Sequence, residues 1–176
     1  KPLKENGFPL ELVTEISARF SHLNSYEVGR ALKESLRTIG EFVGADRSYI
    51  VRFQIEGVMD VTEEWCREGV KPWIRDPSAM DAESYPWFIE KLKKFKSVQV
   101  SHIDDLPLRA HSEKKVFKSQ AIKSLVSVPL IIRGELVGFL GFDTVLNEKC
   151  WSNGILQSLF IISDIFGNAI ERARTD

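Results

Sequence analysis

The sequence has little cysteine and no long apolar run. Its two cysteines, Cys66 and Cys150, lie far apart and in no spacing typical of metal binding or redox chemistry. The longest apolar runs are much shorter than the roughly 18 residues that suggest a membrane-spanning helix, and nothing at the N-terminus resembles a signal peptide. These features favour a cytoplasmic protein in a reducing environment over a disulfide-rich or membrane-inserted one.

An excess of charge of either sign is also missing. The chain has 24 Lys and Arg against 25 Asp and Glu, which gives a formal net charge of -1. Such a balance provides no long-range attraction to nucleic acid or to an anionic membrane, so neither is expected as a partner.

Sequence strings of the common catalytic sites are absent as well. The chain contains no Walker loop, GxSxG, HExxH or GxGxxG string. Its three histidines, His22, His102 and His111, show no metal-ligand spacing. We therefore assign no catalytic residue and no metal ligand, and we do not expect this domain by itself to be an enzyme.

The length of 176 residues is typical of one domain, and a domain of this size buries roughly 70% of its unfolded surface. The chain begins at Lys1 without an initiator Met, and its last residues include no Gly or Pro that would end a helix. We expect a single domain over 1–176 that belongs to a longer protein. Its expected parts are N-terminal helices over 10–44, a sheet with an excursion over 46–145, and a C-terminal helix over 152–176.

Two helices are predicted before the first strand. Apolar residues from Val13 to Leu23 recur at helical spacing and form one stripe. Asn24 fits the N-cap of a second helix, and Glu27 fits the other half of a capping box. Gly44 is well placed to end this helix in a left-handed conformation. The residues expected on its buried face are Val28, Leu32, Leu36, Ile39 and Val43.

The following segments are typical of strands joined by tight turns. Residues 48–55 and 58–65 are separated by Glu56-Gly57, as in a two-residue hairpin. The second hairpin, 124–132 with 135–144, has the strongest strand signal and is expected at the centre of the sheet. Between the hairpins we expect a long excursion over 67–83, short helices near 86–95 and 113–120, and an edge strand at 98–103.

The last predicted helix has a wide apolar surface. Ser152 is its expected cap, and the helix should run from Asn153 to at least Arg174. One stripe is Ile155, Leu159, Ile162, Phe166, Ala169 and Ala173, with Leu156, Phe160 and Ile170 beside it. A helix that covers one face of a sheet needs an apolar stripe of roughly 100° around its axis. The excess predicts a second contact, such as the same helix in a homodimer.

The order of these elements and several local strings resemble the GAF domain. The resemblance covers nearly the whole chain and is most specific at Ala45-Asp46-Arg47, Glu64-Trp65-Cys66, SLVSVPL (124–130) and GELVGFLGFD (134–143). It implies an α/β (α+β) fold with a mainly antiparallel sheet of about six strands, the terminal helices on one face and the excursion helices on the other. It further implies a sensor module upstream of a histidine-kinase or diguanylate-cyclase output domain in a bacterial signalling protein.

A ligand, where GAF domains have one, lies between the sheet and the excursion. The candidate ligand-binding residues are Trp65, Trp73, Trp87, Leu125, Ser127 and Asp143. The tryptophans are expected to gather around the excursion, and the two polar residues stand inside apolar strands where they need partners. Ordinary packing is the alternative for all of them. Which of residues 125–128 face the excursion stays open, because both faces of this hairpin are apolar.

The resemblance identifies no cofactor. Relatives with bilin chromophores typically place His after the attachment Cys, whereas Cys66 precedes Arg67 and Cys150 precedes Trp151. The residue set associated with cyclic-nucleotide binding cannot be placed here. Two alternatives remain beside the ligand-regulated sensor. One is an enzyme like the free methionine-R-sulfoxide reductases, whose cysteine arrangement this chain does not match, and the other is a ligand-free dimerisation relay.

Overall fold

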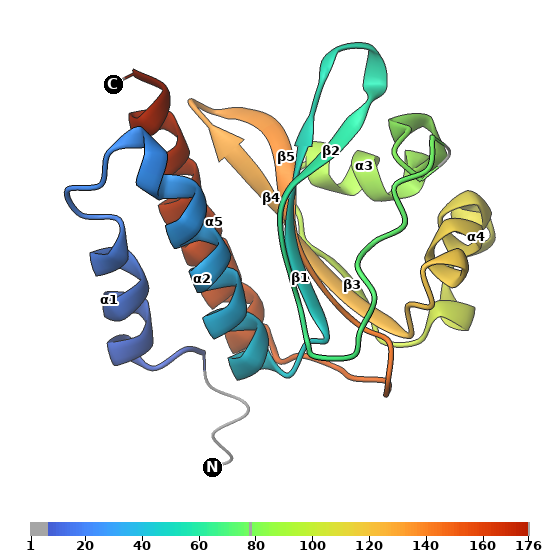
Figure 1. The fold of residues 1–176 in the computed structure, drawn as a ribbon. Helices are drawn as coiled ribbons and strands as arrows, with labels where there is room; N and C mark the ends of the chain where they lie inside the picture. The colour runs from blue at the N-terminus through green and yellow to red at the C-terminus, as the bar shows by residue number, and fades with distance from the viewer. Residues whose placement is uncertain (1–6, 78, 176) are drawn as a thin grey trace.

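The computed structural model describes residues 7–77 and 79–175, and it places helices on both faces of one sheet (Figure 1). One face is covered by α2 (Ser25–Val43) and α5 (Asn153–Thr175), and α1 (Leu10–Arg19) packs on the outer side of these two helices. The short helices α3 (Pro86–Lys93) and α4 (His111–Ser119) lie over the opposite face, together with the extended segment that follows the first hairpin. This arrangement of layers is the predicted one.

In the part of the chain that the structure describes, the sheet has five strands, and all of its neighbouring pairs are antiparallel. The strands are β1 (Arg47–Phe53), β2 (Met59–Cys66), β3 (Val98–Val100), β4 (Ser124–Ile132) and β5 (Glu135–Thr144). Their order in space is β2-β1-β5-β4-β3. The second hairpin therefore supplies the central strand, β5, as predicted.

The expected strand count of about six is corrected to five. In the described residues of this segment, 67–77 and 79–83, strand pairing is limited to an isolated bridge between Asp81 and Val58. Pro72 and Pro77 cannot donate to a strand ladder, which disfavours a further strand in this segment.

The predicted helix ends are confirmed by the hydrogen bonds that form them. The Asn24 side chain accepts hydrogen bonds from the backbone N–H groups of Tyr26 and Glu27, and the Glu27 carboxylate accepts from the Asn24 N–H at 3.0 Å. Gly44 follows α2 with a φ of 75°, a conformation that glycine adopts without strain. Ser152 Oγ accepts from the N–H of Ile155 at 3.2 Å and caps α5.

Both tight turns have the backbone conformation that their hairpins require. Glu56 and Gly57 have φ values of 64° and 77°, and Arg133 and Gly134 have values of 55° and 77°. Two successive positive φ angles match the right-handed twist of the flanking strands. The predicted two-residue turn of the second hairpin is therefore confirmed. The first hairpin instead closes over residues 54–58, because β1 ends at Phe53 and β2 begins at Met59, with a 3-10 turn at Ile55–Gly57 between them.

The sheet separates two hydrophobic cores. The core on the terminal-helix side contains all five residues predicted for the buried face of α2, together with Val126, Val128 and Leu130 of β4. The core on the excursion side contains Leu125 of β4 and Phe139 of β5. Since side chains alternate along a strand, Ser127 lies on the excursion side with Leu125. This settles the facing of β4 that the sequence pattern left open.

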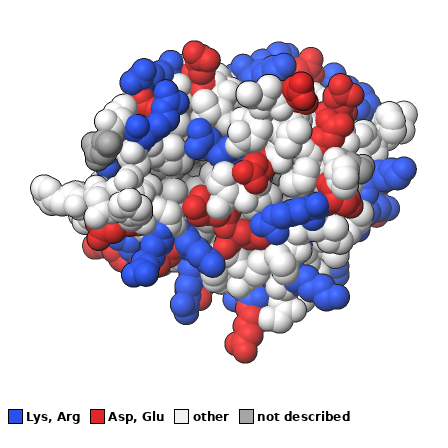
Figure 2. Space-filling model, turned by 45° about the horizontal axis from the view of Figure 1, so that its top comes forward, with Lys and Arg blue, Asp and Glu red and all other residues white. Residues whose placement is uncertain are grey.

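The predicted stripe of α5 is buried from Ile155 through Ala169, and Leu156, Phe160 and Ile170 are half-buried beside it. Ile161, on the same helix, remains 50% exposed. No helix among the described residues has the length and apolarity that crossing a membrane requires. Figure 2 shows basic and acidic side chains interspersed over one face of the molecule, without a large patch of a single sign.

Candidate functional site

A buried arginine joins the sheet to the excursion. The Arg47 side chain, only 3% exposed, donates from Nε to Asp143 Oδ1 at 2.9 Å. Its two terminal nitrogens donate to the backbone carbonyls of Lys71 at 3.1 Å and Gln120 at 2.8 Å. The Arg47 guanidinium thus connects β1 with β5, with the extended segment and with the end of α4. A buried charge of this kind is stable only when paired and hydrogen-bonded in this way.

The second oxygen of the Asp143 carboxylate accepts two further hydrogen bonds. Tyr49 Oη donates to Oδ2 at 3.1 Å, and the indole N–H of Trp73 donates to the same atom at 3.2 Å. The carboxylate is fully buried, and this burial raises the pKa of Asp143 to about 6, although Arg47 and the neutral donors act in the opposite direction. Burial, followed by the Asp143 charge, also raises the pKa of Tyr49 well above its ordinary value.

The segment that carries Trp73 is held at both sides of this residue. Glu64 of β2 accepts from the Trp73 backbone N–H at 2.9 Å and from Arg75 at 2.6 Å. The Gln120 amide receives a hydrogen bond from the Ile74 N–H at 2.8 Å and donates one to the Ile74 carbonyl at 2.9 Å. The Gln120 side-chain amide therefore bonds both backbone groups of Ile74, as the backbone of a neighbouring strand would. These bonds fix the backbone next to Trp73, whose indole contacts Asp143.

Aromatic side chains fill the space between the sheet and the excursion. Phe88 of α3 packs edge-on against Phe139 of β5 with ring centroids 4.9 Å apart, and the rings of Tyr85 and Phe117 complete the cluster. Trp73 and Tyr49 pack edge-to-face at 5.3 Å. The side of the sheet where the resemblance placed a ligand is thus occupied by the protein's own side chains, with Trp73 at the buried charges.

Five of the six candidate residues lie on the excursion side. Trp73, Trp87 and Leu125 belong to its core. Ser127 and Asp143 are buried at 1% and 0% exposure. The structure brings Trp73 and Asp143 into direct contact, whereas Trp87 lies in the first turn of α3 and has Lys91 over its ring at 5.2 Å.

Trp65 lies on the opposite side, which corrects the expected clustering of the three tryptophans. It packs against the terminal-helix core, and a Cβ added at Gly40 of α2 would lie 2.7 Å from its Cζ3 atom. The reason is an irregularity in the β1–β2 register at Ile50/Val51. Such a bulge changes which residues share a face, so Val61 faces the excursion while Trp65, also odd-numbered, faces the helices.

Four residues of the network were not predicted: Arg47, Tyr49, Glu64 and Gln120. Arg47 carried a usable signal, because a charged residue that begins an apolar strand needs a buried partner if the strand is central. In the β1–β5 register this partner, Asp143, stands directly opposite. Gln120 and Glu64 contact the excursion only through tertiary packing, and no spacing along the chain indicates their roles.

The cysteines do not form a reactive pair in this site. Cys66 is half-buried, and burial, together with the nearby carboxylate of Glu64, raises the pKa of its thiol to about 11. Cys150 is exposed in the loop before α5. Across residues 7–77 and 79–175, no three or more His, Cys, Asp or Glu side chains are grouped in a way that could hold a metal ion.

The fold is an α/β architecture with helices on both faces of one antiparallel sheet. The chain belongs to the GAF domain family, whose model matches residues 27–170. It is 32% identical over 170 residues to the methanogenesis regulatory histidine kinase FilI of Methanothrix harundinacea (strain 6Ac). This match covers 93% of the chain but 19% of that kinase, so the chain corresponds to a small part of it.

Solved structures share the fold at low sequence identity. The phycocyanobilin-bound GAF domain of a cyanobacterial phytochrome has a TM-score of 0.76 at 20% identity, with 94% of each chain covered. The GAF domain of the cyanobacteriochrome TePixJ has a TM-score of 0.72 at 17% identity, covering 89% of this chain and 96% of that one. At these identities the likeness establishes the fold alone.

Proposed function

We propose that this domain is the regulatory sensor of a cytoplasmic signal-transduction protein and controls an attached histidine-kinase output domain. The observation that carries the proposal is the contact between Trp73 and Asp143. Trp73 belongs to the excursion, and Asp143 belongs to the central strand whose end leads into α5. The histidine kinase FilI, which contains a segment similar to this chain, supports this choice of output over a diguanylate cyclase.

The proposed signal is a small molecule that binds where Trp73 now lies. Such a ligand would favour a state in which the indole has left Asp143 and other groups satisfy the carboxylate. A ligand shifts a conformational equilibrium only through its different affinities for the two states. Because Trp73 and Tyr49 both donate to a buried charge, and such hydrogen bonds contribute about 1.5–3 kcal/mol each, the ligand must offer a comparable donor.

The proposed output path begins at the end of β5. The Asp46 N–H donates to the Asp143 carbonyl at 2.8 Å, and Asp46 Oδ2 accepts from the backbone N–H groups of Val145 and Leu146. A change at Asp143 therefore acts on the loop that enters α5. We further propose that α5 pairs with α5 of a second copy of this chain, through the exposed Ile161 and its half-buried apolar neighbours.

The test uses the full-length protein and compares two substitutions in neighbouring residues. Trp73→Ala removes the indole from Asp143, whereas Ile74→Ala truncates an adjacent side chain that is 52% exposed. We expect autophosphorylation of the kinase to change by at least about fivefold in the first variant and to stay near wild type in the second. A folded Trp73→Ala protein with wild-type autophosphorylation would contradict the proposal.

A further inference from the structure

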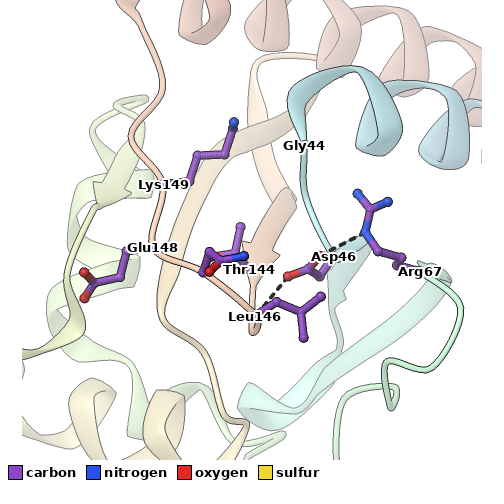
Figure 3. A pocket seen from close by; sticks show the side chains of 8 residues that line it. Gly44, Asp46, Arg67, Thr144, Leu146, Glu148 and Lys149 are labelled. Atoms are coloured by element: carbon purple, nitrogen blue, oxygen red, sulfur yellow. Dashed lines mark hydrogen bonds and ion pairs between the residues drawn. The ribbon is translucent and has the colours of Figure 1, made fainter.

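A cavity lies at the corner where four elements meet, on the route from the sheet to α5. It has a volume of about 320 Å³ and lies among the end of α2, the start of β1, the end of β2 and the loop after β5. Figure 3 shows the side chains that line it. The volume is in the range of small-molecule sites, and no residue of the Trp73–Asp143 contact lines this cavity.

The two carboxylates at this cavity are already engaged. Asp46 Oδ1 accepts from Arg67 Nε at 3.0 Å, and Oδ2 accepts from the N–H groups of Val145 at 2.8 Å and Leu146 at 3.1 Å. Glu148 pairs with His102 at 2.9 Å. Asp46 is thus already paired with Arg67, and neither carboxylate forms an ion pair with Lys149.

The side-chain donors of the cavity come from Arg67, Lys149 and Thr144. Arg67 is 38% exposed at its side chain, and Nη2 donates to the Ala45 carbonyl at 2.8 Å. The Lys149 ammonium forms no ion pair within residues 7–77 and 79–175, and it lies over Gly44, where an added Cβ would be 3.0 Å from Nζ. Lys149 is therefore the lining cation that no carboxylate of the described residues pairs with.

Thr144 adds an observation independent of charge. Thr144 is 3% exposed, and its Oγ1 is buried without a hydrogen-bond partner among the described residues. Thr144 lies in the lining, between the Asp46 side and the Glu148 side of the cavity (Figure 3). A buried hydroxyl without a partner carries a desolvation cost that a bound polar group would remove.

We propose that this corner cavity binds a small organic anion, a carboxylate whose charge is met by Lys149 and Arg67 and one of whose polar atoms reaches Thr144. The loop that lines the site is anchored on both sides, since the Lys149 N–H donates to Ser124 Oγ at 2.8 Å and the Trp151 indole donates to the Val43 carbonyl at 2.9 Å. An anion bound here acts on the start of α5 without entering the excursion side.

The experiment titrates the 176-residue domain with succinate and, separately, with inorganic phosphate to about 10 mM, and follows backbone amide NMR shifts. Succinate should shift the amides of Gly44, Val145 and Lys149. Phosphate distinguishes a carboxylate site from a general oxyanion site, and equal affinity for both would overturn the assignment of a carboxylate. No shift of these amides with succinate would overturn the site itself.

Three variants identify the residues responsible. Lys149→Gln should weaken succinate binding about tenfold, whereas the matched Lys96→Gln, at an exposed lysine after α3, should leave it unchanged. Thr144→Val should weaken binding at least about threefold without lowering the melting temperature, because the hydroxyl has no partner to lose. Equal binding by the two lysine variants, or unchanged binding by Thr144→Val, would contradict the proposal.

Discussion

The indole N–H of Trp73 donates to Asp143 Oδ2 at 3.2 Å, across 70 residues of sequence. The same carboxylate is paired with Arg47 through its other oxygen. The Trp73 indole thus links the excursion to the buried Asp143 carboxylate of the central strand. If the excursion opens, the carboxylate loses this hydrogen-bond donor, which is costly for a buried charge. This makes the contact suitable as a two-state element.

Replacing Trp73 by Phe tests the hydrogen bond while keeping an aromatic ring. The variant loses a donor to a buried carboxylate and some packing against Tyr49, so we expect the free energy of unfolding to fall by about 2–3 kcal/mol. Urea denaturation measures this loss. A loss below about 0.5 kcal/mol, typical of a surface substitution, would show that the contact contributes nothing.

The titration of Asp143 predicts an unusual pH dependence. Its folded pKa of about 6 lies above the ordinary 3.8, so between these values the folded domain binds more protons than the unfolded chain. Through this group, the free energy of unfolding is highest below about pH 4 and falls by up to about 3 kcal/mol as the pH rises through 6.

The matched variant for this prediction is Asp143→Asn, which cannot titrate. Urea unfolding of both proteins at a series of pH values isolates the contribution of this carboxyl. We expect the wild-type advantage over the variant to shrink as the pH rises from 4 to 7. A difference that is constant, or that grows with pH, would mean that Arg47 holds the carboxylate ionised throughout this range.

Gly141 should tolerate no side chain, because the Tyr49 ring lies directly on it. A Cβ at this position would meet Tyr49 Cε1 and would lie 2.9 Å from Cζ. Gly141→Ala must therefore displace the ring that donates to Asp143, at a cost of about 1–3 kcal/mol in thermal or urea unfolding.

Gly29 in α2 provides the comparison for this substitution. There an added Cβ would contact only the end of the Glu63 side chain at 3.3 Å, and Ala is favoured over Gly within a helix. Gly29→Ala should be neutral or stabilising. Equal destabilisation by both variants would contradict the role assigned to the Tyr49 ring.

Thiol labelling tests whether Cys66 is a nucleophile. With a pKa of about 11 and a half-buried side chain, Cys66 should react with iodoacetamide at pH 8 at least about tenfold more slowly than the exposed Cys150. Mass spectrometry of the labelled peptides gives both rates. Faster labelling of Cys66 would revive the hypothesis of a cysteine-dependent enzyme.

Local signals predicted the helices and hairpins well, because they act within a few residues. The Asn24 capping box, the Gly44 helix end and the Arg133-Gly134 turn depend on groups within a few residues of one another. The two strands of the second hairpin follow from one continuous pattern on each side of Arg133-Gly134. The outline of the GAF fold was therefore accessible from the sequence.

The site was only partly accessible, because it depends on strand register and on long-range contacts. Asp143 and Trp73 were both candidates, but their direct contact follows from pairing that brings 47, 73 and 143 together. Trp65 was placed on the wrong face because the irregularity at Ile50/Val51 reverses the alternation along β2. No residue pattern in the strand indicates such a bulge.

The most direct test of the central claim, that Trp73 couples the excursion to α5, is hydrogen–deuterium exchange of the Trp73→Ala domain. We expect faster exchange in residues 69–76, and also in β5 beyond Gly141 and in the first turns of α5, while α1 is unaffected. Acceleration confined to residues 69–76 would contradict the account, because the excursion would then open without any effect on α5.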